Sequence, residues 1–146
     1  MADKNNKTEL THHPEGVLVL RTQAMARDVN ANGDIFGGWV MSQMDIGGSL
    51  LAVEAARGRV VTVTVDKLTF LRPVHVGDII CIYAKIIRIG NTSIDVKLEV
   101  WAKAPFEDYD AQRHIVTEGV FRYVAIDNNG KPKRVPDNIH YPRSIE

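Results

Sequence analysis

Five stretches of the chain combine β-branched and aromatic residues with patches of apolar/polar alternation, and a sixth stretch has a different pattern. The five stretches have the composition of β-strands and cover residues 16–25, 59–71, 78–89, 92–102 and 113–127. Residues 37–57 contain no proline and only scattered β-branched positions, which predicts a helix roughly 30 Å long at about 1.5 Å per residue. The order of one strand, one long helix and four strands predicts an α+β fold with an antiparallel sheet of about five strands.

The connecting and terminal segments have the composition of turns and surface chain. Residues 28–36 are packed with Asn, Asp and Gly and predict a loop, and Gly90-Asn91 between two long strands predicts a tight hairpin. Residues 1–15 are polar without periodicity and are expected to form a flexible arm. The tail at residues 128–146 holds three of the six prolines and is expected to run over the surface without forming a strand. We therefore expect a single domain at residues 16–127.

Composition narrows the classes of function. The 18 Lys and Arg residues balance the 18 Asp and Glu residues, so no overall field attracts nucleic acid or an anionic membrane. A single cysteine, Cys81, excludes an internal disulfide and a cysteine-based zinc site. No apolar run approaches the roughly 20 residues of a membrane span, and the first residues lack the apolar core of a secretory signal. We expect a cytoplasmic protein without nucleic-acid, membrane or metal partners.

One helix can cover only one face of a five-stranded sheet, so the other face or a sheet edge needs a second source of cover. Self-association is the simplest source, and the formal net charge of zero removes one cause of repulsion between copies. We therefore expect a homo-oligomer.

Asp45 is the most informative candidate residue, because it is the one ionisable side chain between positions 37 and 53 of the predicted helix. A carboxylate on a mostly apolar helix either points to a solvent-exposed edge or lies in a partly desolvated site where it can act as a base. Gly37-Gly38 stands at the helix start, where free N–H groups could form an oxyanion hole or simply a tight entry. Gly47-Gly48 inside the helix indicates close approach of another backbone or of a thin ligand.

Polar residues in the preceding loop and basic residues elsewhere are weaker candidates. Asn30 and Asp34 could bond a polar substrate group or a water, although such residues most often only form turns. Arg57 and Arg59 at the C-terminal end of the helix could bind phosphates, as could Arg88. Arginines at the end of a helix, however, usually only interact with the helix dipole.

Several segments in the expected order resemble one enzyme family. NANGDIFGGW at residues 30–39 and MSQMDIGG at residues 41–48 are similar to the YciA-type acyl-CoA thioesterases of the hotdog fold, as are GRVVTV at 58–63, FLRP at 70–73, VGD at 76–78 and EVW at 99–101. The resemblance runs from about residue 16 to residue 127. It implies a long helix wrapped by a curved antiparallel sheet, and dimers that assemble further into a trimer of dimers.

The resemblance also implies a reaction, the hydrolysis of acyl-CoA to a free carboxylic acid and CoA, with no cofactor or metal. Asp45 would act as general base or as nucleophile, the N–H of Gly38 would stabilise the oxyanion, and a loop residue of the facing subunit, Asp34 or Asn30, would assist. Some distant relatives have Asn where this chain has Asp34, so both candidates stay open. The expected substrate-binding residues are Phe36, Gly37, Arg57, Arg59, Thr62 and Arg88.

Two other functions on this fold differ from hydrolysis. A non-catalytic acyl-CoA-binding or sensing module would bind the thioester without releasing a free thiol. A dehydratase would need a catalytic histidine near the helix, and residues 28–57 contain none.

Overall fold

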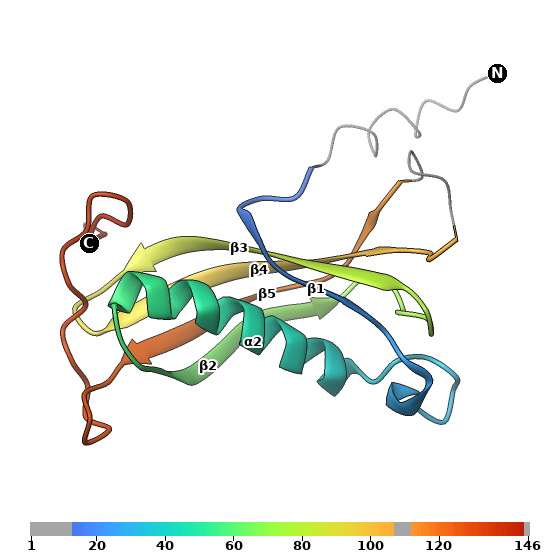
Figure 1. Cartoon of the computed structure of the whole chain (residues 1–146), viewed down its shortest axis with the longest axis horizontal. Helices are drawn as coiled ribbons and strands as arrows, with labels where there is room; N and C mark the ends of the chain where they lie inside the picture. The colour runs from blue at the N-terminus through green and yellow to red at the C-terminus, as the bar shows by residue number, and fades with distance from the viewer. Residues whose placement is uncertain (1–12, 107–111, 145–146) are drawn as a thin grey trace.

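The helix and sheet expected from the sequence are present in the computed structural model, which describes residues 13–106 and 112–144. Five strands form one antiparallel sheet in the order β1-β3-β4-β5-β2, and α2 lies across one face (Figure 1). This α+β arrangement confirms the expected hotdog fold. The elements in chain order are β1 (Val17–Gln23), η1 (Ala26–Asp28), α2 (Gly37–Ala56), β2 (Val60–Phe70), β3 (Ile79–Ile89), β4 (Ser93–Lys103) and β5 (His114–Ala125).

Helix α2 begins and ends where its backbone conformation changes. Phe36 is the N-cap with extended backbone, and no side chain caps the helix start. Arg57 adopts the left-handed conformation with φ of 51°, and its N–H donates to the carbonyl of Val53, so the helix ends one residue before the predicted limit. Among the described residues, no helix is both long enough and apolar enough to cross a membrane.

Small residues let α2 pack closely on the sheet. Val40, Met44 and Ala52 of the helix are buried against the sheet side chains. A Cβ at Gly47 would lie 2.8 Å from Cγ2 of Val19, and a Cβ at Gly48 would lie 2.5 Å from the hydroxyl of Tyr123. The two glycines therefore make room for side chains of the sheet, which corrects the expectation of a second backbone or a ligand at this point.

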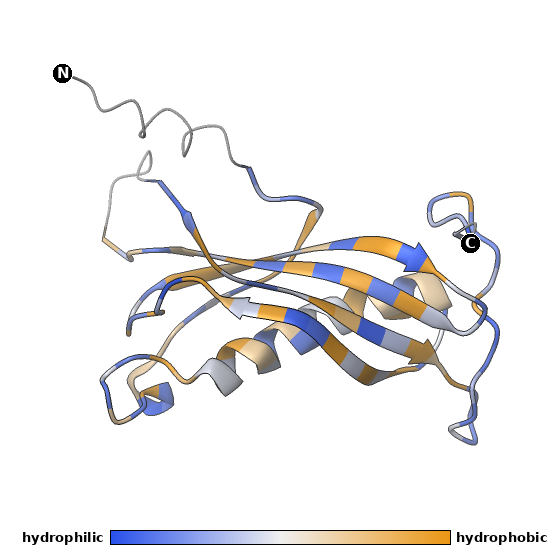
Figure 2. Ribbon diagram, turned by 180° about the vertical axis from the view of Figure 1, so that it is seen from behind, coloured by the Kyte–Doolittle hydropathy of each residue, from blue (hydrophilic) through white to orange (hydrophobic). Residues whose placement is uncertain are grey.

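Apolar residues remain exposed on one side of the helix and along β2. Figure 2 shows the face of the sheet turned away from α2, with hydrophilic and hydrophobic positions interleaved along the strands. Because β2 is an edge strand with apolar exposed positions, it is a surface on which another strand can pair. The exposed apolar residues of α2 and β2 are Ile46, Leu50, Val53, Val61, Val63, Val65 and Phe70.

The C-terminal tail follows the surface, as expected, and contacts the β3–β4 hairpin at Gly90-Asn91. The backbone N–H of Val135 donates to the carbonyl of Asn91 at 2.8 Å, and the N–H of Ser144 donates to the carbonyl of Ile89 at 3.0 Å. Residues 128–144 contain no strand. The expected flexible arm lies largely outside the described residues, because residues 1–12 are not among them. The domain limits at residues 16 and 127 stay a prediction.

Candidate active site

Asp45 is half-buried between α2 and two neighbouring strands. Its Oδ1 accepts a hydrogen bond from Oγ1 of Thr62 at 2.6 Å and one from the hydroxyl of Tyr123 at 3.1 Å. Its Oδ2 makes no hydrogen bond or ion pair to another described residue. The carboxylate is therefore held through one oxygen, while the other oxygen is available for chemistry. Thr62 was expected to bind substrate, and in the structure its hydroxyl contacts Asp45.

Tyr123 also contacts Asp45, although no pattern in the sequence points to this residue. The residue is fully buried on β5, and its hydroxyl also lies 3.1 Å from the backbone carbonyl oxygen of Asp45. Burial raises the pKa of the Tyr123 phenol, and the charge of Asp45 and its hydrogen bond raise that pKa further. The phenol therefore keeps its proton and acts as the donor toward Asp45.

The raised pKa of the Tyr123 phenol predicts a specific loss of stability at high pH. Unfolding exposes Tyr123 and returns its pKa to about 10, so alkaline pH ionises the unfolded state and not the folded state. The stabilisation is complete below pH 10 and is lost as the pH rises above it. Between pH 9 and pH 11, the free energy of unfolding should fall by about 1.4 kcal/mol more in the wild type than in Tyr123→Phe, measured by urea denaturation. Equal losses in the two proteins would contradict this prediction.

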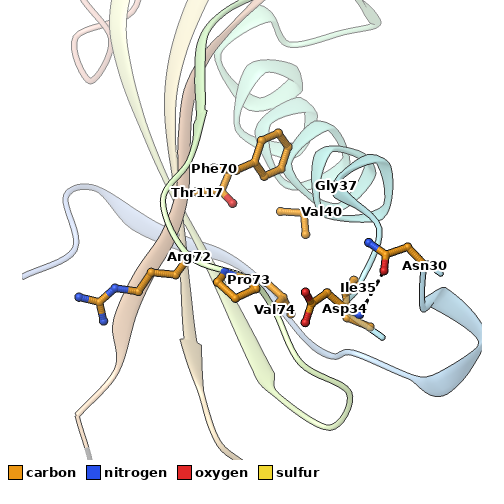
Figure 3. A pocket seen from close by; sticks show the side chains of 10 residues that line it. All are labelled: Asn30, Asp34, Ile35, Gly37, Val40, Phe70, Arg72, Pro73, Val74 and Thr117. Carbon is orange, nitrogen blue, oxygen red and sulfur yellow. Dashed lines mark hydrogen bonds between the residues drawn. The ribbon is translucent and has the colours of Figure 1, made fainter. Parts of the chain in front are cut away.

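The start of α2 borders a cavity of about 270 Å³. The N–H groups of Trp39 and Val40 donate to the carbonyl of Phe36, whereas those of Gly37 and Gly38 have no acceptor within the described chain. A Cβ added at Gly38 would meet nothing within 4 Å. Two free donors at the positive end of the helix dipole can therefore stabilise a developing negative charge. The cavity is lined by Asn30, Asp34, Ile35, Gly37, Val40, Phe70, Arg72, Pro73, Val74 and Thr117 (Figure 3).

The loop before α2 places both open candidates, Asn30 and Asp34, at this cavity. Oδ1 of Asn30 accepts the backbone N–H groups of Asn32 at 2.8 Å and Asp34 at 3.2 Å, which leaves the Nδ2 amide as a donor. Oδ1 of Asp34 lies 3.4 Å from Nδ1 of His75, which belongs to the loop between β2 and β3. Asn30 therefore offers a donor to a bound group, and Asp34 offers an acceptor that is shared with His75.

The arginines expected to bind substrate lie at the opposite end of the molecule from this cavity. Arg57 and Arg59 are exposed beyond the end of α2, about 30 Å from its start for a helix of 20 residues. Arg88, near the β3–β4 hairpin, lies 4.0 Å from Asp95 and donates to Ser93. One protomer therefore does not bring these arginines to its own cavity. Phe36, at the helix start, is 52% exposed.

Asp45 and the start of its own helix are too far apart to act on one thioester. Asp45 lies eight positions after Gly37, which corresponds to about 12 Å along a helix at about 1.5 Å per residue, whereas a carbonyl bond spans only about 1.23 Å. Asp45 is also absent from the cavity lining. The chain thus carries two separate groups with the chemistry of an acyl-transfer site, a carboxylate and an N–H-bearing helix end, and it does not bring them together within one copy.

Comparison with known proteins identifies the family that this fold and site define. The model of the thioesterase superfamily matches residues 32–105. The chain belongs to this superfamily.

Individual relatives are similar in sequence or in structure over most of the chain. The acyl-CoA thioester hydrolase YciA of Escherichia coli strain K12 is 58% identical over 127 residues, which cover 86% of this chain and 96% of that protein. The crystal structure of a hexameric thioesterase, y2039 of Yersinia pestis, is 57% identical with a TM-score of 0.80, covering 86% of this chain and all of that chain. HI0827, a hexameric broad-specificity acyl-coenzyme A thioesterase, matches as an aspartate-to-alanine variant at 50% identity and a TM-score of 0.81, covering 86% of this chain and 90% of that chain.

Proposed function

We propose that this protein hydrolyses acyl-CoA thioesters at a site formed by Asp45 of one protomer and the start of helix α2 of its partner. The observation that carries the proposal is the separation of about 12 Å between Gly37 and Asp45 in one chain. Neither half alone combines a free carboxylate oxygen with an oxyanion hole. Both halves have the chemistry that thioester hydrolysis needs.

The reaction follows from the groups at the two halves. The thioester oxygen accepts the N–H of Gly38, assisted by Nδ2 of Asn30, so that negative charge can develop on it. Asp45 either takes a proton from an attacking water as general base or attacks the carbonyl carbon itself to form an anhydride that water then opens. In both routes the C–S bond breaks, CoA leaves as a thiolate and the acyl group ends as a carboxylic acid. A thiolate is a good leaving group, so the proposed reaction uses no metal or cofactor.

The cavity at the helix start is the proposed site of the acyl group. Val40, Phe70 and Val74 give it an apolar lining beside the N–H of Gly37, which suits a hydrocarbon chain next to a polarised carbonyl. The phosphates of CoA lie outside this small space. Arg57, Arg59 and Arg88 can meet those phosphates only if they come from another protomer.

The exposed apolar surface of α2 and β2 supports the assembly that the proposal requires. Antiparallel pairing of β2 with the β2 of a second copy would continue the sheet and bring two α2 helices side by side in opposite directions. Gly37 of one helix then faces Asp45 of the other when the two-fold axis passes beside Met41, halfway between them in sequence. We further propose that three such dimers form a hexamer, the assembly described for HI0827 and y2039.

An assay of thiol release tests the proposed function directly. The purified wild-type protein is incubated with acyl-CoAs of increasing chain length, and the free thiol and the free acid are measured together. We expect both products in equal amounts. Saturable acyl-CoA binding without thiol release would instead support a non-catalytic acyl-CoA-binding or sensing module.

A further inference from the structure

Two hydroxyl groups from adjacent strands meet at the same oxygen of Asp45. Thr62 of β2 and Tyr123 of β5 are direct partners in the antiparallel register, so their side chains leave the sheet on the same face, roughly 5 Å apart at Cβ. Both hydroxyls reach Oδ1, at 2.6 Å and 3.1 Å. This cross-strand pair fixes one carboxylate oxygen from two directions and leaves Oδ2 without a partner among the described residues.

The helix is shaped to admit the larger of these two side chains. A Cβ at Gly48 would lie 2.5 Å from the Tyr123 hydroxyl, 2.9 Å from Cδ1 of Leu98 and 3.2 Å from Cζ of Tyr123. A glycine inside a helix costs about 1 kcal/mol relative to alanine. Because glycine has no Cβ, this position leaves room for the phenol to extend from the sheet to Asp45.

The direction of the hydrogen bond is set by the surroundings of the phenol. Tyr123 is fully buried, and its hydroxyl keeps its proton because burial and the neighbouring Asp45 charge raise the pKa of the phenol. A neutral phenol donates to a carboxylate in a charge-assisted bond, which is stronger than a bond between neutral groups. Tyr123 therefore holds the Asp45 carboxylate in one orientation.

We propose that Tyr123 is a positioning residue for thioester hydrolysis, which holds Oδ1 of Asp45 together with Thr62 and so presents Oδ2 as the reacting oxygen. This inference rests on the proposed function, because it assigns a role through Asp45. Tyr123 touches Asp45 and not the substrate. Among the described residues, it is also the one ionisable side chain hydrogen-bonded to Asp45, and Thr62 from β2 is neutral.

The Tyr123→Phe variant tests the proposal, because it removes the donor and keeps the ring. We expect kcat for butyryl-CoA to fall about tenfold, as for the loss of a hydrogen bond to a charged group, while KM stays within about twofold. A residue with a merely structural role would lower the folded fraction and leave kcat per folded protein as in the wild type.

Two further variants keep the test decisive. Tyr83→Phe is the matched control: the Tyr83 hydroxyl accepts from Arg113, away from Asp45, so kcat and KM should both stay as in the wild type. Gly48→Ala keeps the phenol but displaces it, because its Cβ would lie 2.5 Å from the hydroxyl. It should therefore reproduce the fall in kcat at nearly unchanged KM even if Tyr123→Phe folds poorly.

The outcomes separate this inference from the proposed function. If kcat per folded protein of Tyr123→Phe, or of Gly48→Ala in its place, matches the wild type while Asp45→Asn is inactive, Tyr123 has no positioning role. If the wild type releases no thiol from butyryl-CoA or any longer acyl-CoA, the proposed function itself fails.

Discussion

Substitution of Asp45 by asparagine is expected to lower kcat for acyl-CoA hydrolysis by at least about a thousandfold, within the range for removal of a general base or nucleophile. The amide is nearly isosteric and keeps an oxygen that can accept the hydrogen bonds of Thr62 and Tyr123, at 2.6 Å and 3.1 Å in the wild type. The amide group that replaces Oδ2 can neither accept a proton nor attack a carbonyl. Thiol release should therefore disappear while CoA binding and the oligomer survive.

Glu54→Gln provides the matched control for this experiment. Glu54 is the other acidic residue of α2 and is exposed near the end of the helix, so its neutralisation should leave kcat unchanged. Turnover of Asp45→Asn within tenfold of the wild type would remove Asp45 from the mechanism. A loss of the oligomer in Asp45→Asn would show that the residue acts through folding or assembly.

The Gly38→Pro substitution should produce the second large effect, a fall in kcat of about 10²–10³, the usual result of removing one oxyanion donor. Proline deletes the N–H of Gly38, which makes no hydrogen bond within the described chain. Because the first turn of a helix needs no such donor, proline is tolerated there far better than in the helix interior. The helix should therefore persist, as measured by circular dichroism, while the thioester oxygen loses a partner.

Gly38→Ala separates the loss of the N–H from the presence of a side chain. A Cβ at this position would meet no atom within 4 Å, and the N–H remains, so kcat should stay within about threefold of the wild type. Equal losses in the alanine and proline variants would point to a steric effect. Full activity of Gly38→Pro would place the oxyanion hole elsewhere.

The sequence predicts the helix, the strands, Asp45 and the glycine pair at the helix start because these depend on local pattern. Asp45 stands out as the single ionisable residue between positions 37 and 53, and the glycines at the helix start are visible as a pair. Tyr123 carries no such local signal. It reaches Asp45 because β5 pairs with β2 in a register that sets Tyr123 opposite Thr62, and a slip of β5 by one residue would turn Tyr123 to the other face of the sheet.

For the arginines, the sequence predicts the chemistry but not the position, and their role in binding substrate stays a prediction. Arg57 and Arg59 have the right charge for phosphate, but a helix of 20 residues separates them from the cavity. The cavity itself joins the loop before α2, the end of β2, the segment after it and β5. Only the tertiary arrangement brings Asn30, Phe70 and Thr117 together.

Mixed oligomers of Asp45→Asn and Gly38→Pro test most directly whether two protomers share each site. Each variant alone should be almost inactive, because every site lacks one half. Differently tagged copies are co-expressed, and the oligomers that carry both tags are purified. With random pairing, half of the pairs are mixed, and each mixed pair has one intact site. These oligomers should therefore show about a quarter of the wild-type thiol release. Activity no higher than that of the two parent variants would contradict the shared site and place Asp45 and its oxyanion donor within a single protomer.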